Sequence, residues 1–105
     1  MPQFDVYKNP SKRSSTFFPY LVDIQHNYIS DIDTRIVLPL GKAKYFKNKS
    51  MSKLQISLSY ENEELFIITP QISSISRKLL NKPIGSLAHL RQEIIDSLDF
   101  AISGI

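Results

Sequence analysis

The sequence predicts a mainly β fold with one C-terminal α-helix. Several short segments alternate apolar and polar residues with the period of two that is typical of β-strands. Proline, glycine and polar turn residues separate these segments. The part of the chain after Gly85 instead repeats apolar residues at the spacing of a helix. Short strands followed by one terminal helix favour a small β-barrel, or a sheet with a helix packed on it.

The first half of the chain predicts three strands separated by polar segments, at residues 3–7, 16–25 and 35–40. In the first, Phe4 and Val6 share a face. The alternation in the second strand places four apolar side chains on one face: Phe18, Tyr20, Val22 and Ile24. The third is apolar on both faces, which predicts a buried strand. We expect Pro39 and Gly41 to end it.

The second half predicts a hairpin and then a weaker strand. Residues 54–60 give the clearest half-buried alternation in the chain, and Glu61, Asn62 and Glu63 are expected to form the turn. The return strand covers residues 64–69 and stops at Pro70. A weaker strand is predicted at residues 74–80, followed by a break at residues 82–85.

The terminal helix is predicted from its start signal, its apolar stripe and its end signal. Ser86 is a suitable N-cap, and Gly104 occupies the position where a glycine commonly ends a helix. The stripe between them comprises Leu87, Leu90, Ile94, Leu98 and Ala101, widened by Ile95 and Ile102. Phe100 falls on the opposite, polar face. A large aromatic side chain there favours a contact with a partner, and the alternative is a lone exposed ring or one covered by the sheet.

Length and composition restrict the function classes. The chain of 105 residues fits a single domain spanning residues 1–105. It contains no cysteine and no apolar run of membrane-spanning length, and its N-terminus does not resemble a signal peptide, so we expect a cytoplasmic protein. Three widely separated glycines cannot form a local phosphate-binding loop. His89 and Glu93 lie one helical turn apart, a spacing that more often gives a surface contact than a metal site. We therefore expect no metal, no cofactor and no catalytic centre.

The net charge of +3 is concentrated locally in one lysine-rich segment. Its members are Lys42, Lys44, Lys47, Lys49 and Lys53. Such a cluster suits an acidic protein segment, and the alternative is a solvated loop. Direct nucleic-acid binding is not expected, because the segment lacks arginine, which dominates base readout.

Read together, four segments resemble the CcdB family of toxins from type II toxin–antitoxin systems. They are Phe4-Asp5-Val6-Tyr7, Leu21-Val22-Asp23-Ile24-Gln25, Thr34-Arg35-Ile36-Val37-Leu38-Pro39-Leu40 and the terminal helix with Gly104-Ile105. The resemblance implies an SH3-like barrel, which ribonuclease toxins share, assembled as a homodimer. It implies the A subunit of DNA gyrase as the target, trapped while it is joined to cleaved DNA, and a CcdA-type antitoxin as the second partner. It also implies that the toxin performs no chemistry.

The resemblance assigns residues to each partner. The positions that match the family's gyrase contacts are His26, Tyr28, Ile29, Asp99, Phe100, Ile102, Ser103, Gly104 and Ile105. We assign Lys42, Lys44, Lys47 and Lys49 to the acidic antitoxin. The family pattern ends in Trp-Gly-Ile, whereas this chain has Ser103 at the tryptophan position.

Two other functions remain open at this point. The first is an endoribonuclease toxin on the same barrel, because a fold does not fix a function. Its acid–base assembly would combine Arg35 with His26 or a nearby carboxylate. The second is a plain interaction module that uses the lysine-rich segment alone.

Overall fold

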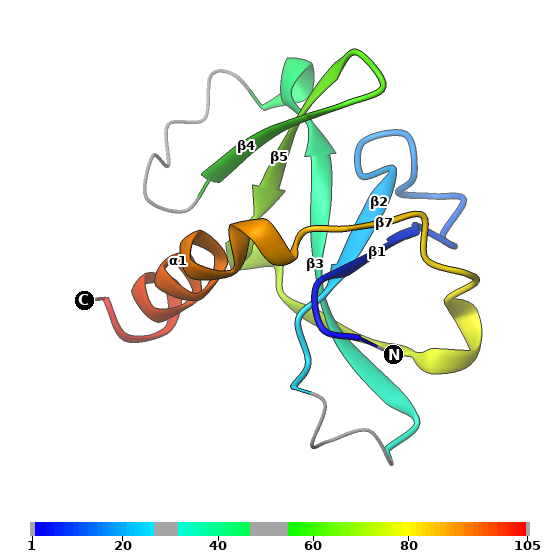
Figure 1. The fold of residues 1–105 in the computed structure, drawn as a ribbon. Helices are drawn as coiled ribbons and strands as arrows, with labels where there is room; N and C mark the ends of the chain where they lie inside the picture. Colours follow the sequence, from blue (N-terminus) through cyan, green and yellow to red (C-terminus); the bar gives the residue numbers. More distant parts are fainter. Residues whose placement is uncertain (1, 27–31, 47–54, 105) are drawn as a thin grey trace.

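A computed structural model describes residues 2–26, 32–46 and 55–104. In this part of the chain, seven strands form one antiparallel sheet that curls into a half-barrel, with a single α-helix beside it (Figure 1). The elements are β1 (Asp5–Lys8), β2 (Tyr20–Asp23), β3 (Thr34–Lys42), β4 (Gln55–Tyr60), β5 (Glu63–Ile68), β6 (Ser73–Ser76), β7 (Gly85–Ser86) and α1 (Arg91–Ser103). The strand order is β4-β5-β3-β2-β1-β7, and β6 pairs separately with β3. The prediction of a mainly β fold with one C-terminal helix is confirmed.

The central strand β3 continues through Pro39 and Gly41, so the expectation that these residues end it was wrong. The first part of β3, up to Val37, pairs with β6, and the last part, from Leu40, pairs with β5. Pro39 lies between these two pairings, where its missing N–H interrupts neither ladder. Gly41 is required for a different reason, because an added β-carbon would approach the Phe46 ring to 2.6 Å.

Other element boundaries also differ from the prediction. β2 covers only Tyr20–Asp23 of the predicted range 16–25, and β6 ends at Ser76, where a short 3-10 helix (Arg77–Leu79) begins. The predicted break contains β7, which pairs with β1. The helix begins at Arg91, after a 3-10 turn at Ala88–Leu90. The expectation that Ser86 caps the helix was wrong, because the N-cap of α1 is Leu90; the Ser86 Oγ instead accepts a hydrogen bond from the Ala88 N–H at 3.2 Å.

The predicted alternation places side chains on the two faces of the sheet as expected. One face forms the main core with the helix, and its buried members are Phe4, Val6, Val22, Leu38, Leu40, Leu65, Ile67, Leu87 and Ile94. The other face carries a smaller cluster of Tyr7, Leu21, Val37 and Leu80. Leu90 and Leu98 pack partly buried against the main core, which confirms the inner stripe of α1. Ala101 and Ile102, at the end of that stripe, are exposed.

The β4–β5 turn and the C-terminal end of α1 both contain residues with left-handed backbone. Glu61 and Asn62 form the β4–β5 turn with φ of 49° and 64°, the geometry of a two-residue hairpin turn whose twist matches the strands. Gly104 ends α1 with φ of 75°, and its N–H donates to the Phe100 carbonyl at 2.9 Å. The predicted helix end is confirmed, and so is the turn at Glu61 and Asn62, whereas Glu63, expected in the turn, begins β5. Among the residues that the structure describes, no helix is long and apolar enough to cross a membrane.

Candidate binding surfaces

The end of α1 presents an apolar side chain to solvent. Ile102 is 77% exposed, and it lies between the exposed residues Ala101 and Ser103. Phe100 is half-buried and makes a contact within the protein, so it is neither a lone exposed ring nor a core residue. The Ser103 hydroxyl donates to the Asp99 carbonyl at 2.6 Å, which ties that side chain to its own helix.

The other predicted gyrase contacts follow β2. His26 is exposed there and has its own interaction in the protein. Figure 1 shows β2 and the end of α1 on separate parts of the molecule. Tyr28, Ile29 and Ile105 lie outside the described residues.

Two of the four predicted antitoxin lysines lie beside an exposed aromatic pair. Phe17 and Tyr45 are 48% and 43% exposed, and their rings meet edge to face with centroids 5.0 Å apart. The Lys44 ammonium group lies 5.3 Å from the centroid of the Tyr45 ring. Lys42, at the end of β3, is half-buried, and its backbone N–H donates to the Phe17 carbonyl at 3.0 Å. Lys47 and Lys49 lie outside the described residues.

The sequence analysis did not pair Phe17 with the lysine-rich segment, whose own aromatic residues include Tyr45. Phe17, just before β2, reaches Tyr45, just after β3, because β2 and β3 pair side by side. The sequence held one signal, because the alternation predicted over residues 16–25 places Phe17 and Phe18 on opposite faces.

Arg35 is a structural residue in this fold. Its side chain is 0% exposed and forms a bidentate ion pair with the buried Asp23, through Nε to Oδ2 at 2.7 Å and Nη2 to Oδ1 at 3.0 Å. Gln25 completes the cluster by accepting from the Ile36 N–H at 3.1 Å. Burial and the neighbouring Asp23 raise the pKa of Asp5 above its ordinary value. With no exposed surface, Arg35 cannot contact an RNA substrate, which removes the assembly considered for the ribonuclease alternative.

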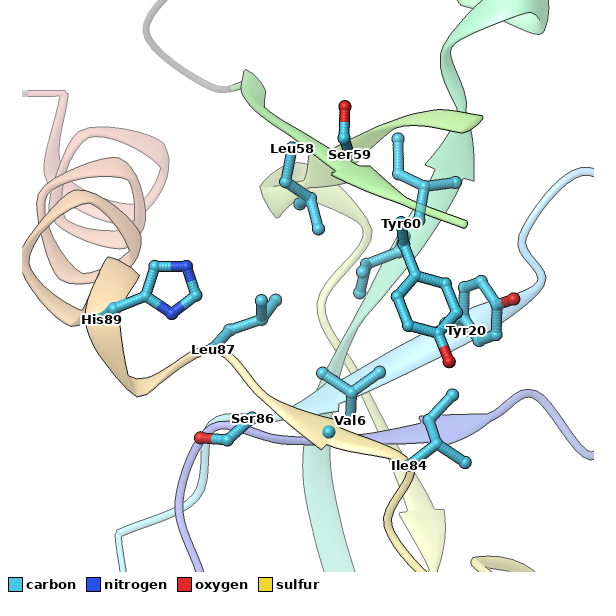
Figure 2. A pocket seen from close by; sticks show the side chains of 12 residues that line it. Val6, Tyr20, Leu58, Ser59, Tyr60, Ile84, Ser86, Leu87 and His89 are labelled. Carbon is cyan, nitrogen blue, oxygen red and sulfur yellow. The ribbon is translucent and has the colours of Figure 1, made fainter. Parts of the chain in front are cut away.

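A cavity of about 330 Å³ lies in the open mouth of the half-barrel, between the two end strands of the sheet. Figure 2 shows Leu58 and Tyr60 of β4 on one side, and Ile84, Leu87 and His89 of the chain around β7 on the other. The rings of Tyr20 and Tyr60 meet edge to face at 5.2 Å. Burial, and then the neighbouring Tyr60 and acidic side chains, raise the pKa of Tyr20, so its hydroxyl keeps its proton at neutral pH. This cavity was not predicted from the sequence.

The fold and these surfaces define a small half-barrel protein whose exposed aromatic, apolar and basic side chains suit contacts with other macromolecules. Compared with known protein families, the chain matches the one described as CcdB protein over residues 3–104. The chain belongs to the CcdB family, and it is a toxin of a toxin–antitoxin system.

Proposed function

We propose that this toxin binds the A subunit of DNA gyrase and traps the enzyme while it is covalently joined to cleaved DNA. Membership of the CcdB family over nearly the whole chain supports this target. The structural observation that carries it is the exposed end of α1, where Ile102 is 77% exposed beside half-buried Phe100. A protruding apolar side chain on an ordered helix is a suitable anchor for a protein interface. In this proposal the toxin acts by binding alone, in the cytoplasm where gyrase meets DNA.

The complete gyrase surface in this proposal requires a homodimer. In one chain, β2 and the end of α1 lie on separate parts of the molecule (Figure 1). A two-fold pairing repeats each patch on the second chain and so builds one larger surface from both copies. Tyr28, Ile29, Asp99, Ser103, Gly104 and Ile105 remain members of the proposed surface.

We assign the second partner, an acidic CcdA-type antitoxin, to the surface formed by Lys42, Lys44, Phe17 and Tyr45, with Lys47 and Lys49 as further members. The lysines attract an acidic segment at long range, which mainly raises the association rate. The aromatic pair offers apolar area that a purely electrostatic site would lack. Association that slows steeply with added salt supports this assignment, whereas tight salt-sensitive binding to bare DNA contradicts it.

The deciding experiment combines purified gyrase, supercoiled plasmid and this protein. We expect inhibition of supercoiling and, after detergent is added, release of cleaved DNA that carries covalently bound gyrase. Ile102→Glu should abolish the cleaved product, whereas Leu79→Glu, the same change at a 53% exposed residue outside the proposed site, should retain it. Unchanged supercoiling overturns the proposal, and RNA cleavage in the absence of gyrase would support the ribonuclease alternative instead.

A further inference from the structure

The cavity in the mouth of the half-barrel owes part of its space to one glycine. Gly85 pairs with Val6, and directly opposed residues of an antiparallel pair point to the same face of the sheet. Val6 is buried in the main core, so position 85 points to the same face, at the open edge of the sheet where Gly85 itself is exposed. A β-carbon at Gly85 would meet no atom within 4 Å, and its φ is not left-handed. Neither close packing nor backbone geometry therefore requires glycine here.

A glycine without a local structural reason is costly in a strand. It lowers the stability of the folded chain through its backbone entropy and offers no side chain to pack. An apolar side chain at position 85 would extend into the open space of the cavity, which Leu58 and Leu87 also line. Departures from good packing are expected where a site needs space.

The lining determines what the cavity accepts. The described residues around it include no Lys, Arg, Asp or Glu, and they are mostly aliphatic or aromatic. An anion would find no cationic partner among these residues, and the acidic side chains near Tyr20 would repel it, so the lining suits a neutral occupant. The hydroxyls of Tyr20 and Tyr60 and the ring of His89 supply a few polar groups at the edge of the apolar surface. Mostly apolar pockets with a few polar groups are typical of small-molecule sites, including the mouths of β-barrels.

We propose that the cavity between β4 and β7 is a binding site for a neutral aromatic molecule of about two fused rings with one hydrogen-bonding group. The size follows from volume, since a cavity of about 150 Å³ holds one benzene ring and this cavity has about 330 Å³. The rings pack between Leu58 and Leu87, beside Tyr60, and the polar group lies toward the tyrosine hydroxyls or His89. This site is independent of the proposed gyrase and antitoxin surfaces.

The test uses 2-naphthol as the probe and the full chain as the protein. We expect saturable one-to-one binding by calorimetry, with methyl NMR shifts confined to Val6, Leu58, Ile84 and Leu87. Naphthalene-2-sulfonate has the same rings but carries a charge, and it should bind at least about tenfold more weakly because its charge must be desolvated.

Variants of Gly85 separate the cavity from nonspecific adsorption. Gly85→Leu should raise the thermal midpoint and weaken 2-naphthol binding by about tenfold or more, because the new side chain occupies the same space. Gly85→Val has a smaller side chain and replaces Gly85→Leu in this test if the leucine variant does not fold. Ser57→Leu adds the same side chain on the exposed face of β4 and should leave binding unchanged. The proposal is overturned if 2-naphthol shows no saturable binding, or if it binds folded Gly85 variants as well as the unchanged protein. It is also overturned if 2-naphthol binding is lost when two copies of the chain associate.

Discussion

Phe100 is the residue at which the predicted interface can be tested most directly. It is half-buried near the end of α1, and Ser103 stands one turn later where the family pattern has tryptophan. An aromatic residue at the centre of an interface commonly supplies ~2 kcal/mol or more, and that loss weakens binding by roughly thirtyfold. Residues three apart on a helix are neighbours, so Phe100 is placed to fill part of the site that a tryptophan at position 103 would occupy.

We expect Phe100→Ala to reduce gyrase poisoning by roughly thirtyfold in the supercoiling assay. The domain should still fold, because truncation of a half-buried ring costs less than the ~3–5 kcal/mol of a core aromatic. Ser103→Trp should leave poisoning unchanged or strengthen it. Thermal unfolding provides the control. If Phe100→Ala melts the domain while removal of Ile105 leaves gyrase inhibition intact, the helix end is not the contact.

Arg35 shows how burial decides between a catalytic and a structural role. Arg35→Met leaves the Asp23 carboxylate buried without its cation, and breaking a buried pair from one side costs about 3–5 kcal/mol. Asp23→Leu with Arg35→Met removes both charges and should recover part of that loss. The measurement is the free energy of unfolding in urea. A fully stable Arg35→Met variant would show that the pair contributes nothing to folding and would reopen a chemical role.

At the scale of elements, α1 is attached to the sheet by more than its apolar stripe. Ser97 is buried on the inner face of the helix, and its Oγ lies 2.7 Å from the Thr69 Oγ1, which is also buried after β5. Helical periodicity identifies the stripe but treats serine as polar, so this bond was not predictable from the sequence. Only the packing of α1 against the end of β5 brings residues 28 positions apart together.

We expect Ser97→Ala to lower the free energy of unfolding by about 1–3 kcal/mol, because it leaves a buried hydroxyl at Thr69 without this partner. Adding Thr69→Val should cost little more, since removing both polar groups is nearly neutral. Ser103→Ala on the exposed end of the same helix is the control, with a change within about 0.5 kcal/mol. Fully additive effects of the Ser97 and Thr69 changes would show that the two hydroxyls are not coupled.

The difference between local and long-range contacts explains which elements the sequence could predict. The β4–β5 hairpin was predicted because one alternating strand, a short polar turn and a return strand are adjacent in the chain. The continuation of β3 through Pro39 was not, since it depends on β5 and β6 sharing one edge of that strand. β7 has two residues, too few for any periodic pattern. The cavity arises from the curl of the whole sheet, which no local pattern records.

At the scale of the whole molecule, the single chain leaves apolar surface uncovered at the end of α1. Leu87 and Ile94 of the apolar stripe are buried in the main core, whereas Ala101 and Ile102, at its end, are exposed to solvent. Ile102 is 77% exposed on an ordered helix, and helix ends without a covering partner usually carry polar residues. A second copy related by a two-fold axis would bring the two helix ends together, so that both copies contribute to one larger apolar surface that stays open to gyrase.

We therefore expect a homodimer at micromolar concentration in sedimentation equilibrium. Ile102→Glu should shift the equilibrium toward monomer by about tenfold or more in dissociation constant, because two like charges would lie close to each other across the axis. Leu79→Glu makes the same change at a 53% exposed residue of the 3-10 helix after β6 and should leave the dimer intact. A wild-type monomer at micromolar concentration contradicts the pairing altogether. Monomers from Leu79→Glu but not from Ile102→Glu would move the interface from the helix end to the face around Arg77–Leu79, and the gyrase surface would then have to be built from a single chain.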